Sequence, residues 1–292
     1  MNLGAEVKKP SFSMLRYPGG KSVLYPYISK LLKLNGFSNA TYIEPYAGGA
    51  GVALALLLRE QVEKVVINDF DQAIYAFWRA IFTENERFVE VLKSVDISIE
   101  EWQRQKTIYK STNPDLFELG FATFYLNRTN RSGVLNAGVI GGIEQLGKYK
   151  IDARFNRSAL IEKARLLGRY ASRIQILNRN GVEVIEEYSW DQNSFVYADP
   201  PYFEKGSQLY LNAFKEDDHI ALAEVLNRNS DSNWMLTYDN HDFIRNLYPS
   251  RSMDIFSLNY SVHNARKANE LMVISDNLKA PEGFGTTFVK RS

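Results

Sequence analysis

Short apolar runs and helical spacings alternate in the first and last parts of the chain. Residues 41–45 and 65–67 are apolar runs bounded by turn residues, a pattern typical of buried strands. Residues 72–82 follow with apolar positions three and four apart, as in a helix. The second half repeats the alternation, with strands at 174–177, 194–198 and 234–237 and helices at 157–170 and 217–227. This pattern predicts an α/β fold with a mostly parallel sheet and helices on both faces.

The middle of the chain lacks this alternation. Residues 85–155 are polar, aromatic and loop-rich, with helical pieces near 86–93, 98–110 and 121–128 and a Gly- and Asn-rich stretch at 129–150. We therefore expect a catalytic domain of residues 1–84 and 156–292, interrupted by a small, mostly helical module of residues 85–155. Near the end, residues 253–275 predict two strands around a loop at 261–269, an antiparallel terminal hairpin.

Composition excludes several kinds of site. The 292 residues contain 35 Lys and Arg against 34 Asp and Glu, so the net charge of +1 excludes a bulk polybasic protein. The absence of cysteine excludes disulfides, thiolate zinc sites, iron–sulfur clusters and cysteine nucleophiles. His219, His241 and His263 lack a metal-ligand spacing, so we expect no metal. The longest apolar run, residues 51–58, is too short to cross a bilayer, and we expect a cytoplasmic protein.

A glycine turn follows the first strand. Gly48, Gly49 and Gly51 stand where the strand meets a helix, and glycine lets a backbone turn tightly and approach a ligand. Asp69 ends the second strand, where a carboxylate can accept hydrogen bonds from ribose hydroxyls. Because ligands of open α/β sheets bind at the carboxyl ends of strands, these residues together indicate an adenosine-type ligand.

Other interpretations of the glycine residues remain open at this point. The turn differs from a dinucleotide fingerprint, because the required third glycine falls on Leu54. Residues 19–22 resemble the end of a phosphate loop, but Leu15 stands where such a loop needs glycine. A small-residue turn used only for packing and an enzyme that binds NAD or ATP are the alternatives.

The sharpest motif is Asp199, Pro200, Pro201 and Tyr202, directly after the apolar strand 194–198. Two prolines end the strand and stiffen the turn, so a carboxylate and a backbone carbonyl form a rigid pair of acceptors. Such a pair matches an amino group with two hydrogens to donate, and the tyrosine offers a flat face on which a base can stack. A double-proline turn without chemistry is the structural alternative.

The motif suits methyl transfer to the exocyclic amine of adenine. That nitrogen is a poor nucleophile, because its lone pair is conjugated into the ring. Acceptors for both hydrogens favour a tetrahedral nitrogen with a localised lone pair, which can attack a sulfonium methyl group in line. The enzyme then contributes positioning and electrostatics without a covalent intermediate.

In their order along the chain, these motifs resemble the Dam-like family of bacterial and phage DNA adenine-N6 methyltransferases. The resemblance covers nearly the whole chain and rests on residues 16–21, 44–51, 68–69, 124–133 and 199–202. It implies a Rossmann-like methyltransferase sheet, S-adenosylmethionine as cofactor and a target adenine flipped out of duplex DNA. Residue 17, often Trp in the family, is Tyr, and the loop at 133–149 is longer, so the family's target sequences do not transfer.

The resemblance also assigns residues to roles. It implies a catalytic motif of Asp199, Pro200, Pro201 and Tyr202. The residues implied for the cofactor are Tyr17, Gly20, Lys21, Glu44, Tyr46, Gly48, Gly49, Gly51, Asp69 and Asp199.

Positive charge concentrates around the family's DNA-proximal segment. Residues 120–157 contain six basic side chains against Glu144 and Asp152, a balance of +4 in a chain whose total is +1. Arg can bridge guanine and Asn can bridge adenine in the major groove. We expect DNA contacts from Asn127, Arg128, Asn130, Arg131, Lys148 and Arg154.

The sequence thus predicts a site-specific adenine-N6 methyltransferase acting on double-stranded DNA, as in restriction–modification systems. The same chemistry on RNA and a catalytically silent DNA-binding relative are the alternatives. For the oligomeric state, a monomer and a weak dimer both remain open.

Overall fold

The computed structural model describes residues 12–16, 21–204, 214–260, 266–281 and 287–288. Tyr17 and Gly20, both expected at the cofactor, lie outside the described residues. No helix in the described part of the chain is long and apolar enough to cross a membrane.

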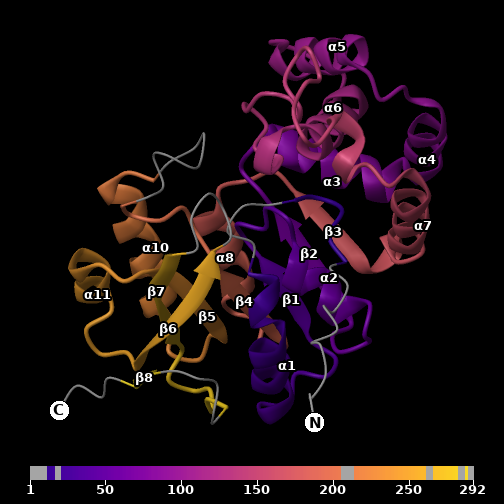
Figure 1. The fold of residues 1–292 in the computed structure, drawn as a ribbon. Coiled ribbons are helices and arrows are strands. Elements are labelled where there is room, and N and C mark those ends of the chain that lie inside the picture. The colour runs from indigo at the N-terminus through magenta and orange to yellow at the C-terminus, as the bar shows by residue number, and fades with distance from the viewer. Residues whose placement is uncertain (1–11, 17–20, 205–213, 261–265, 282–286, 289–292) are drawn as a thin grey trace, which may run out of the picture.

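A single eight-stranded sheet forms the centre of the molecule, in the order β3-β2-β1-β4-β5-β7-β6-β8 (Figure 1). β1 to β5 run parallel to one another, whereas β7 pairs antiparallel with both β5 and β6. The strands are β1 (Thr41–Glu44), β2 (Lys64–Asn68), β3 (Ile174–Leu177), β4 (Ser194–Ala198), β5 (Trp234–Asp239), β6 (Met253–Tyr260), β7 (Arg266–Ile274) and β8 (Thr287–Phe288).

Helices cover both faces of the sheet, because alternate side chains of each strand enter different cores. Tyr42 of β1 belongs to the core under α1, α2 and α3, whereas Ile43 belongs to the core under α8, α10 and α11. The helices are α1 (Tyr25–Leu34), α2 (Gly51–Leu57), α3 (Gln72–Thr83), α4 (Asn85–Ser94), α5 (Ile99–Lys110), α6 (Leu116–Thr129), α7 (Arg157–Gly168), α8 (Gly181–Tyr188), α10 (Glu216–Arg228) and α11 (Asp242–Leu247).

The expected fold class is confirmed. The predicted strands at 174–177 and 194–198 are β3 and β4 without any shift. The parallel sheet covered on both faces and the antiparallel terminal hairpin are both present. Short 3₁₀ helices add detail that periodicity does not reveal: η1 (Ser22–Leu24), η2 (Arg131–Gly133), η3 (Ile151–Arg154) and η4 (Ala171–Arg173).

The helices α3 to α7 gather at one side of the sheet, away from α10 and α11 (Figure 1). Phe77 of α3, Phe88 of α4 and the α6 rings Phe121 and Phe124 pack against one another in a shared aromatic cluster. The helices of the middle segment therefore belong to the same apolar core as α3. The boundaries of an inserted module at 85 and 155 stay a prediction.

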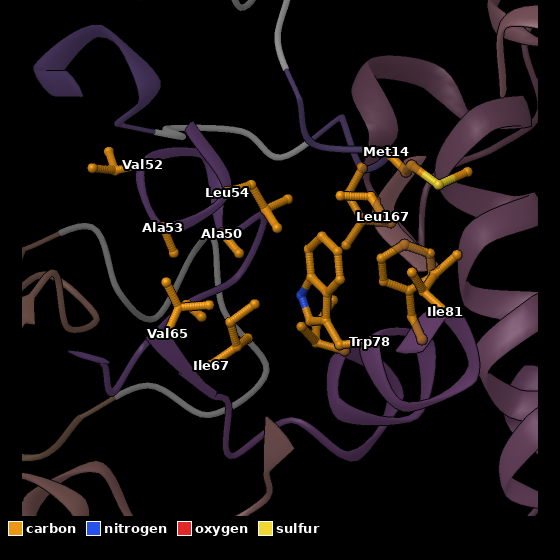
Figure 2. Packing of buried hydrophobic residues seen from close by; sticks show 14 of the residues in the cluster. Met14, Ala50, Val52, Ala53, Leu54, Val65, Ile67, Trp78, Ile81 and Leu167 are labelled. Carbon is orange, nitrogen blue, oxygen red and sulfur yellow. The ribbon is translucent and has the colours of Figure 1, made fainter. Parts of the chain in front are cut away.

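Trp78 connects this helical group to the sheet edge. Figure 2 shows its indole between Leu54 of α2 on one side and Ile81 and Leu167 on the other. The ring is fully buried, and its N–H donates a 2.8 Å hydrogen bond to the carbonyl oxygen of Gly48. Packing of α3 thus fixes the turn after β1.

Candidate active site

The turn after β1 is held by backbone hydrogen bonds. The N–H of Ala47 donates to the carbonyl of Asn68 at 2.9 Å, which ties the end of β1 to the end of β2. Gly48 adopts a positive φ of 46°, a conformation that glycine reaches without a steric penalty. Its N–H points at Asp69 and donates to Oδ2 at 2.8 Å. The turn and the acid at the end of β2 therefore form one unit.

Asp69 is oriented by two backbone donors. Besides Gly48, the N–H of Asp71 donates to Oδ1 at 3.0 Å. Burial raises the pKa of Asp69 to about 7, although both hydrogen bonds oppose the rise. Each carboxylate oxygen has further lone pairs, so the group can accept hydrogen bonds from a ribose diol.

Two side chains beside Asp69 complete the end of β2. Phe70 follows directly and is 60% exposed, an unusual degree for a phenylalanine. Asn178, just after β3, donates from its amide to the carbonyls of Asp69 and Phe70 and fixes their backbone. The exposed ring offers a stacking surface beside Asp69. Sequence reasoning missed Phe70, because a single aromatic residue after a strand has no distinctive pattern.

Glu44 lies on the buried side of the glycine turn. Its Oε1 accepts a 2.9 Å hydrogen bond from the N–H of Ala53 in the first turn of α2. Burial raises the pKa of Glu44 to about 8, and the nearby Asp199 carboxylate adds to the rise. The carboxyl group therefore anchors the first turn of α2 beside the catalytic motif.

The other residues expected at the cofactor divide into two groups. Gly51 approaches η1 closely, because a Cβ there would lie 3.2 Å from the Cβ of Ser22, and Gly49 is buried within the turn. Tyr46 instead packs against Phe214, at 5.6 Å between ring centroids, and against Gly181 on the face covered by α8 and α10. The buried hydroxyl of Tyr46 has no hydrogen-bond partner among the described residues.

Asp199 extends from the end of β4 into a chain of hydroxyl groups. Thr237 of β5 donates to Asp199 Oδ1 at 2.7 Å, so its oxygen accepts from the hydroxyl of Tyr197, which lies 3.0 Å away. Both Tyr197 and Thr237 are buried. These two strands thus fix the carboxylate orientation before any substrate arrives.

Tyr202, Lys21 and Glu270 surround the other side of Asp199. The ammonium of Lys21 lies 3.2 Å from Asp199 Oδ2 and 3.6 Å from Glu270 Oε2. It also lies 4.8 Å from the centroid of the Tyr202 ring. The Tyr202 hydroxyl donates to Glu270 Oε2 at 2.8 Å, a closer acceptor than Asp199 Oδ1 at 3.4 Å. Lys21, expected at the cofactor, therefore contacts the catalytic motif.

The turn that carries Pro200, Pro201 and Tyr202 is held from β5. Both oxygens of Asp239 accept backbone hydrogen bonds, from Phe203 N at 3.0 Å and from Glu204 N at 2.8 Å. Asp239 and Glu270 face each other in the register of β5 and β7. Thr237, Asp239 and Glu270 were all missing from the residues expected at the site.

The cofactor and catalytic motifs meet at one edge of the sheet. β1 pairs in parallel with β2 on one side and with β4 on the other, so the loops after these three strands leave the same edge. Asp69 and Asp199 therefore flank the glycine turn from either side. The edge combines two oriented carboxylates with the backbone of a glycine turn.

A second polar region forms where the N-terminal segment meets the end of α6. Asn127 accepts from the N–H of Arg16 at 2.7 Å and donates to the carbonyls of Arg16 and Gly133 at 3.1 and 2.8 Å. Gly133 has a φ of 76°, and a Cβ there would collide with the Arg16 carbonyl. Asn127 thus connects the segment before Lys21 to the loop after α6.

Asn130 has a similar structural role. It is fully buried, donates to the carbonyls of Val134 and Leu135, and accepts from the indole N–H of Trp102 at 2.7 Å. The amide groups of Asn127 and Asn130 are therefore engaged inside the protein. The expectation that these two side chains contact DNA directly needs correction, since burial leaves neither at the surface.

Arg128 lies among other cations. Burial lowers its pKa to about 10, and the neighbouring Arg16 lowers it further. Burial and then Arg154 lower the pKa of Arg16, and burial and then Arg128 lower that of Lys163. Within the described ranges, no carboxylate comes within ion-pair distance of Arg128, and its Nε has no hydrogen-bond partner. This concentration of positive charge favours binding of an anion at the cluster.

Exposed side chains surround this basic cluster. Arg131, Lys148 and Arg154 are all exposed, as DNA-contacting residues need to be. The loop between η2 and η3 also exposes apolar side chains, of which Leu146 is 86% exposed and Tyr149 59%. Such exposure of a leucine indicates an interaction surface.

No metal centre is visible in the described part of the chain. None of its His, Asp and Glu side chains form a group of three that could hold a metal ion.

Comparisons with known proteins identify the family. A model of the D12 class N6 adenine-specific DNA methyltransferases matches residues 17–265. The chain belongs to this family. The expected DNA adenine-N6 methyltransferase is confirmed, and with it S-adenosylmethionine as the cofactor. A D12 class enzyme transfers the methyl group to N6 of adenine in DNA.

Two curated relatives are similar over most of their length. The Type II methyltransferase M.MjaIII of Methanocaldococcus jannaschii is 28% identical over 229 residues, covering 72% of this chain and 77% of that protein. The Type II methyltransferase M.CviBI of Paramecium bursaria Chlorella virus NC1A is 25% identical over 242 residues, covering 80% and 86%. A structure described as a class I S-adenosylmethionine-dependent methyltransferase of Listeria monocytogenes is 12% identical with a TM-score of 0.40; the match covers 96% of this chain and 66% of that one.

Proposed function

We propose that this D12 class enzyme methylates one adenine in a specific double-stranded DNA sequence after the base has rotated out of the helix. The observation that carries the proposal is the rigid acceptor Asp199, held by Thr237 at the same sheet edge as Asp69 and the turn at Gly48. Base rotation is required because the amine is otherwise paired inside the duplex. The Type II relatives support a role in a restriction–modification system.

The residues at the end of β1 and β2 fit S-adenosylmethionine. Asp69 presents lone pairs to the ribose diol, and the exposed Phe70 ring can stack on the cofactor's adenine. Gly48, Gly49 and Gly51 carry no side chains, so the methionine portion can approach the backbone of the turn closely. When bound, the cofactor supplies an electrophilic sulfonium methyl group.

Residues of the turn after β4 bind the target amine. Asp199 and the carbonyl of Pro200 accept the two hydrogens of the N6 amine, while Pro201 stiffens the turn. The Tyr202 ring stacks on the base, and its hydroxyl contact with Glu270 fixes the ring. With the cofactor bound, the amine nitrogen would bond to the methyl carbon as the carbon–sulfur bond breaks and S-adenosylhomocysteine leaves. The Asp199 carboxylate, already hydrogen-bonded to the amine, would accept the proton that the nitrogen loses.

The surface around α6 and the loop after it supports DNA binding. We assign phosphate or base contacts to Arg128, Arg131, Lys148 and Arg154, and a positioning role to Asn127 and Asn130. We also propose that residues 85–155 are the target-recognition module. Exposed cations neutralise phosphates, and exposed apolar side chains such as Leu146 can contact base edges or sugars.

A methyl-transfer assay tests the proposal. Purified protein is incubated with labelled S-adenosylmethionine and equal amounts of duplex DNA, single-stranded DNA or RNA, with Asp199→Ala as control. We expect N6-methyladenine in duplex DNA from the parent and none from the variant. Equal labelling of RNA would contradict duplex DNA as substrate. DNA binding without transfer by the parent would indicate a catalytically silent relative.

A further inference from the structure

The ammonium of Lys21 occupies the contacts that the target amine needs. In the free protein it lies 3.2 Å from Asp199 Oδ2 and 4.8 Å from the centre of the Tyr202 ring. Asp199 Oδ1 already accepts a 2.7 Å hydrogen bond from Thr237. Both oxygens of the catalytic carboxylate are therefore engaged before a base arrives. An incoming adenine has to displace one of these donors.

Glu270 offers Lys21 a second position. Its Oε2 lies 3.6 Å from the ammonium, so a shift of a few tenths of an ångström suffices to change the closer partner. Lys21 is 7% exposed and Glu270 only 1%, and a buried ammonium without a carboxylate is strongly unfavourable. Thr237 has no comparable second carboxylate within the described residues, since its hydroxyl is shared between Tyr197 and Asp199. Of the two donors, Lys21 is thus the one that can leave Asp199.

We propose that Glu270 is a positioning residue that receives the Lys21 ammonium when the adenine amine takes its place on Asp199. The inference rests on the proposed function. Glu270 also accepts the hydroxyl of Tyr202 at 2.8 Å, so the same carboxylate orients the stacking ring. Glu270 of β7 therefore links two events. Lys21 moves away from Asp199, and the Tyr202 ring is held in the position where the base stacks on it.

The coupling predicts a specific defect in Glu270→Gln. Glutamine keeps an oxygen for the Tyr202 hydroxyl but removes the negative charge, so Lys21 stays on Asp199 and competes with the amine. We expect the affinity for flipped substrate to fall about tenfold or more, as for loss of a charged hydrogen-bond partner. Binding of S-adenosylhomocysteine should change less than twofold, because Asp69 and the glycine turn are untouched.

The measurement uses a duplex with adenine at the target position and 2-aminopurine as its stacking neighbour, whose fluorescence rises when the target adenine leaves the stack. The target itself stays adenine, because 2-aminopurine lacks the 6-amino group that Asp199 would accept. The target sequence is first obtained by sequencing modified bases in DNA from cells that express the protein. Titrations compare the parent, Glu270→Gln and the exposed-surface control Glu224→Gln on α10, each with S-adenosylhomocysteine present. Only Glu270→Gln should lose affinity, and thermal unfolding confirms that it is folded.

A double variant separates the proposal from a merely structural role. If Glu270 acts through Lys21, then Glu270→Gln should have little further effect in a Lys21→Met background. Tyr202→Phe, which removes only the hydroxyl, gives a second test with a smaller expected loss. An unchanged titration for Glu270→Gln, an equal loss with and without Lys21, or an equal loss of S-adenosylhomocysteine binding would overturn the inference. A parent protein that does not methylate DNA would instead contradict the proposed function.

Discussion

The backbone N–H of Gly48 donates a 2.8 Å hydrogen bond to Asp69, so the turn after β1 and the acid after β2 hold each other in place. The pKa of Asp69 is raised to about 7 by burial. Ribose hydroxyls donate to the ionised carboxylate, which is the minor form at pH 6 and the major form at pH 8.

Binding of S-adenosylhomocysteine should therefore tighten between pH 6 and 8, by up to about tenfold. Asp69→Asn cannot ionise, so its weaker binding should vary less with pH. The affinity of each protein for S-adenosylhomocysteine is measured by calorimetry at four pH values. The ratio of the two affinities at each pH removes the effect of protonation of the ligand itself. A constant ratio across this range would contradict the role of Asp69.

Glu44 should make the stability of the protein depend on pH. Its pKa is about 8 in the folded state, above the ordinary value of 4.5, so the folded state holds the proton more tightly. This contribution is complete below pH 4.5 and is lost as pH rises toward 8. Glu44→Gln keeps an oxygen for the N–H of Ala53 but has no proton to lose.

Thermal unfolding of the parent and of Glu44→Gln should diverge as pH rises from 5.5 to 8.5, with the variant gaining relative stability. Asp69 contributes with the same sign but is present in both proteins. Parallel curves would show that Glu44 titrates at its ordinary pKa.

Asp199→Ala should abolish methyl transfer while sparing the cofactor. Loss of a preorganised hydrogen-bonding group at the reacting atom lowers kcat by about 100-fold or more. S-adenosylhomocysteine binding should change little, because Asp69 and Gly48 remain. The exposed Asp231→Ala serves as the matched control and should keep full activity in the same methyl-transfer assay.

Trp78→Phe should loosen the glycine turn. The substitution keeps an aromatic ring but removes the N–H that donates to the Gly48 carbonyl, leaving a buried acceptor unpaired. Such a loss costs about 1–3 kcal/mol, measurable by urea unfolding. Cofactor affinity should fall as well, whereas Trp190→Phe, at a 65% exposed position, should change neither quantity.

Lys148→Ala and Arg154→Ala should each weaken DNA binding in a salt-dependent manner. Each lost phosphate contact reduces the slope of log affinity against log salt by about one. Arg128→Ala should weaken DNA binding more, since the Arg128 guanidinium lies beside Arg16 in a partly buried cluster of cations. The exposed Lys33→Ala on α1 is the control. Identical salt slopes for all variants would remove this surface from the interface.

The fold and the principal motifs could be predicted because their signals are local. Strand β3 is apolar apart from Gln175, strand β4 is apolar after Ser194, and Asp199 to Tyr202 is a contiguous motif. Glu270 was missed although it precedes the apolar residues 271–274, where a buried carboxylate is unusual. Its partner Tyr202 becomes a neighbour only through the antiparallel register of β7.

Charge and residue type alone could not separate DNA contacts from internal structure. Arg157 contributes to the positive balance of residues 120–157, yet its guanidinium donates to the carbonyls of Leu92 and Val95 at the end of α4. Asn127 has the chemistry of a base reader but binds Arg16, 111 residues away in sequence. These contacts depend on long-range packing, which a local pattern does not encode.

β7 lies between β5 and β6 in the sheet, although it follows both of them in the sequence. A nascent chain still short of residue 270 has no partner for the inner edge of β5 and no carboxylate beside Tyr202. Since chains begin to fold as they leave the ribosome, the surroundings of Tyr202 are complete only after β7 has been synthesised and has paired with β5. Nascent copies that lack β7 therefore have the motif at residues 199–202 without its partner carboxylate.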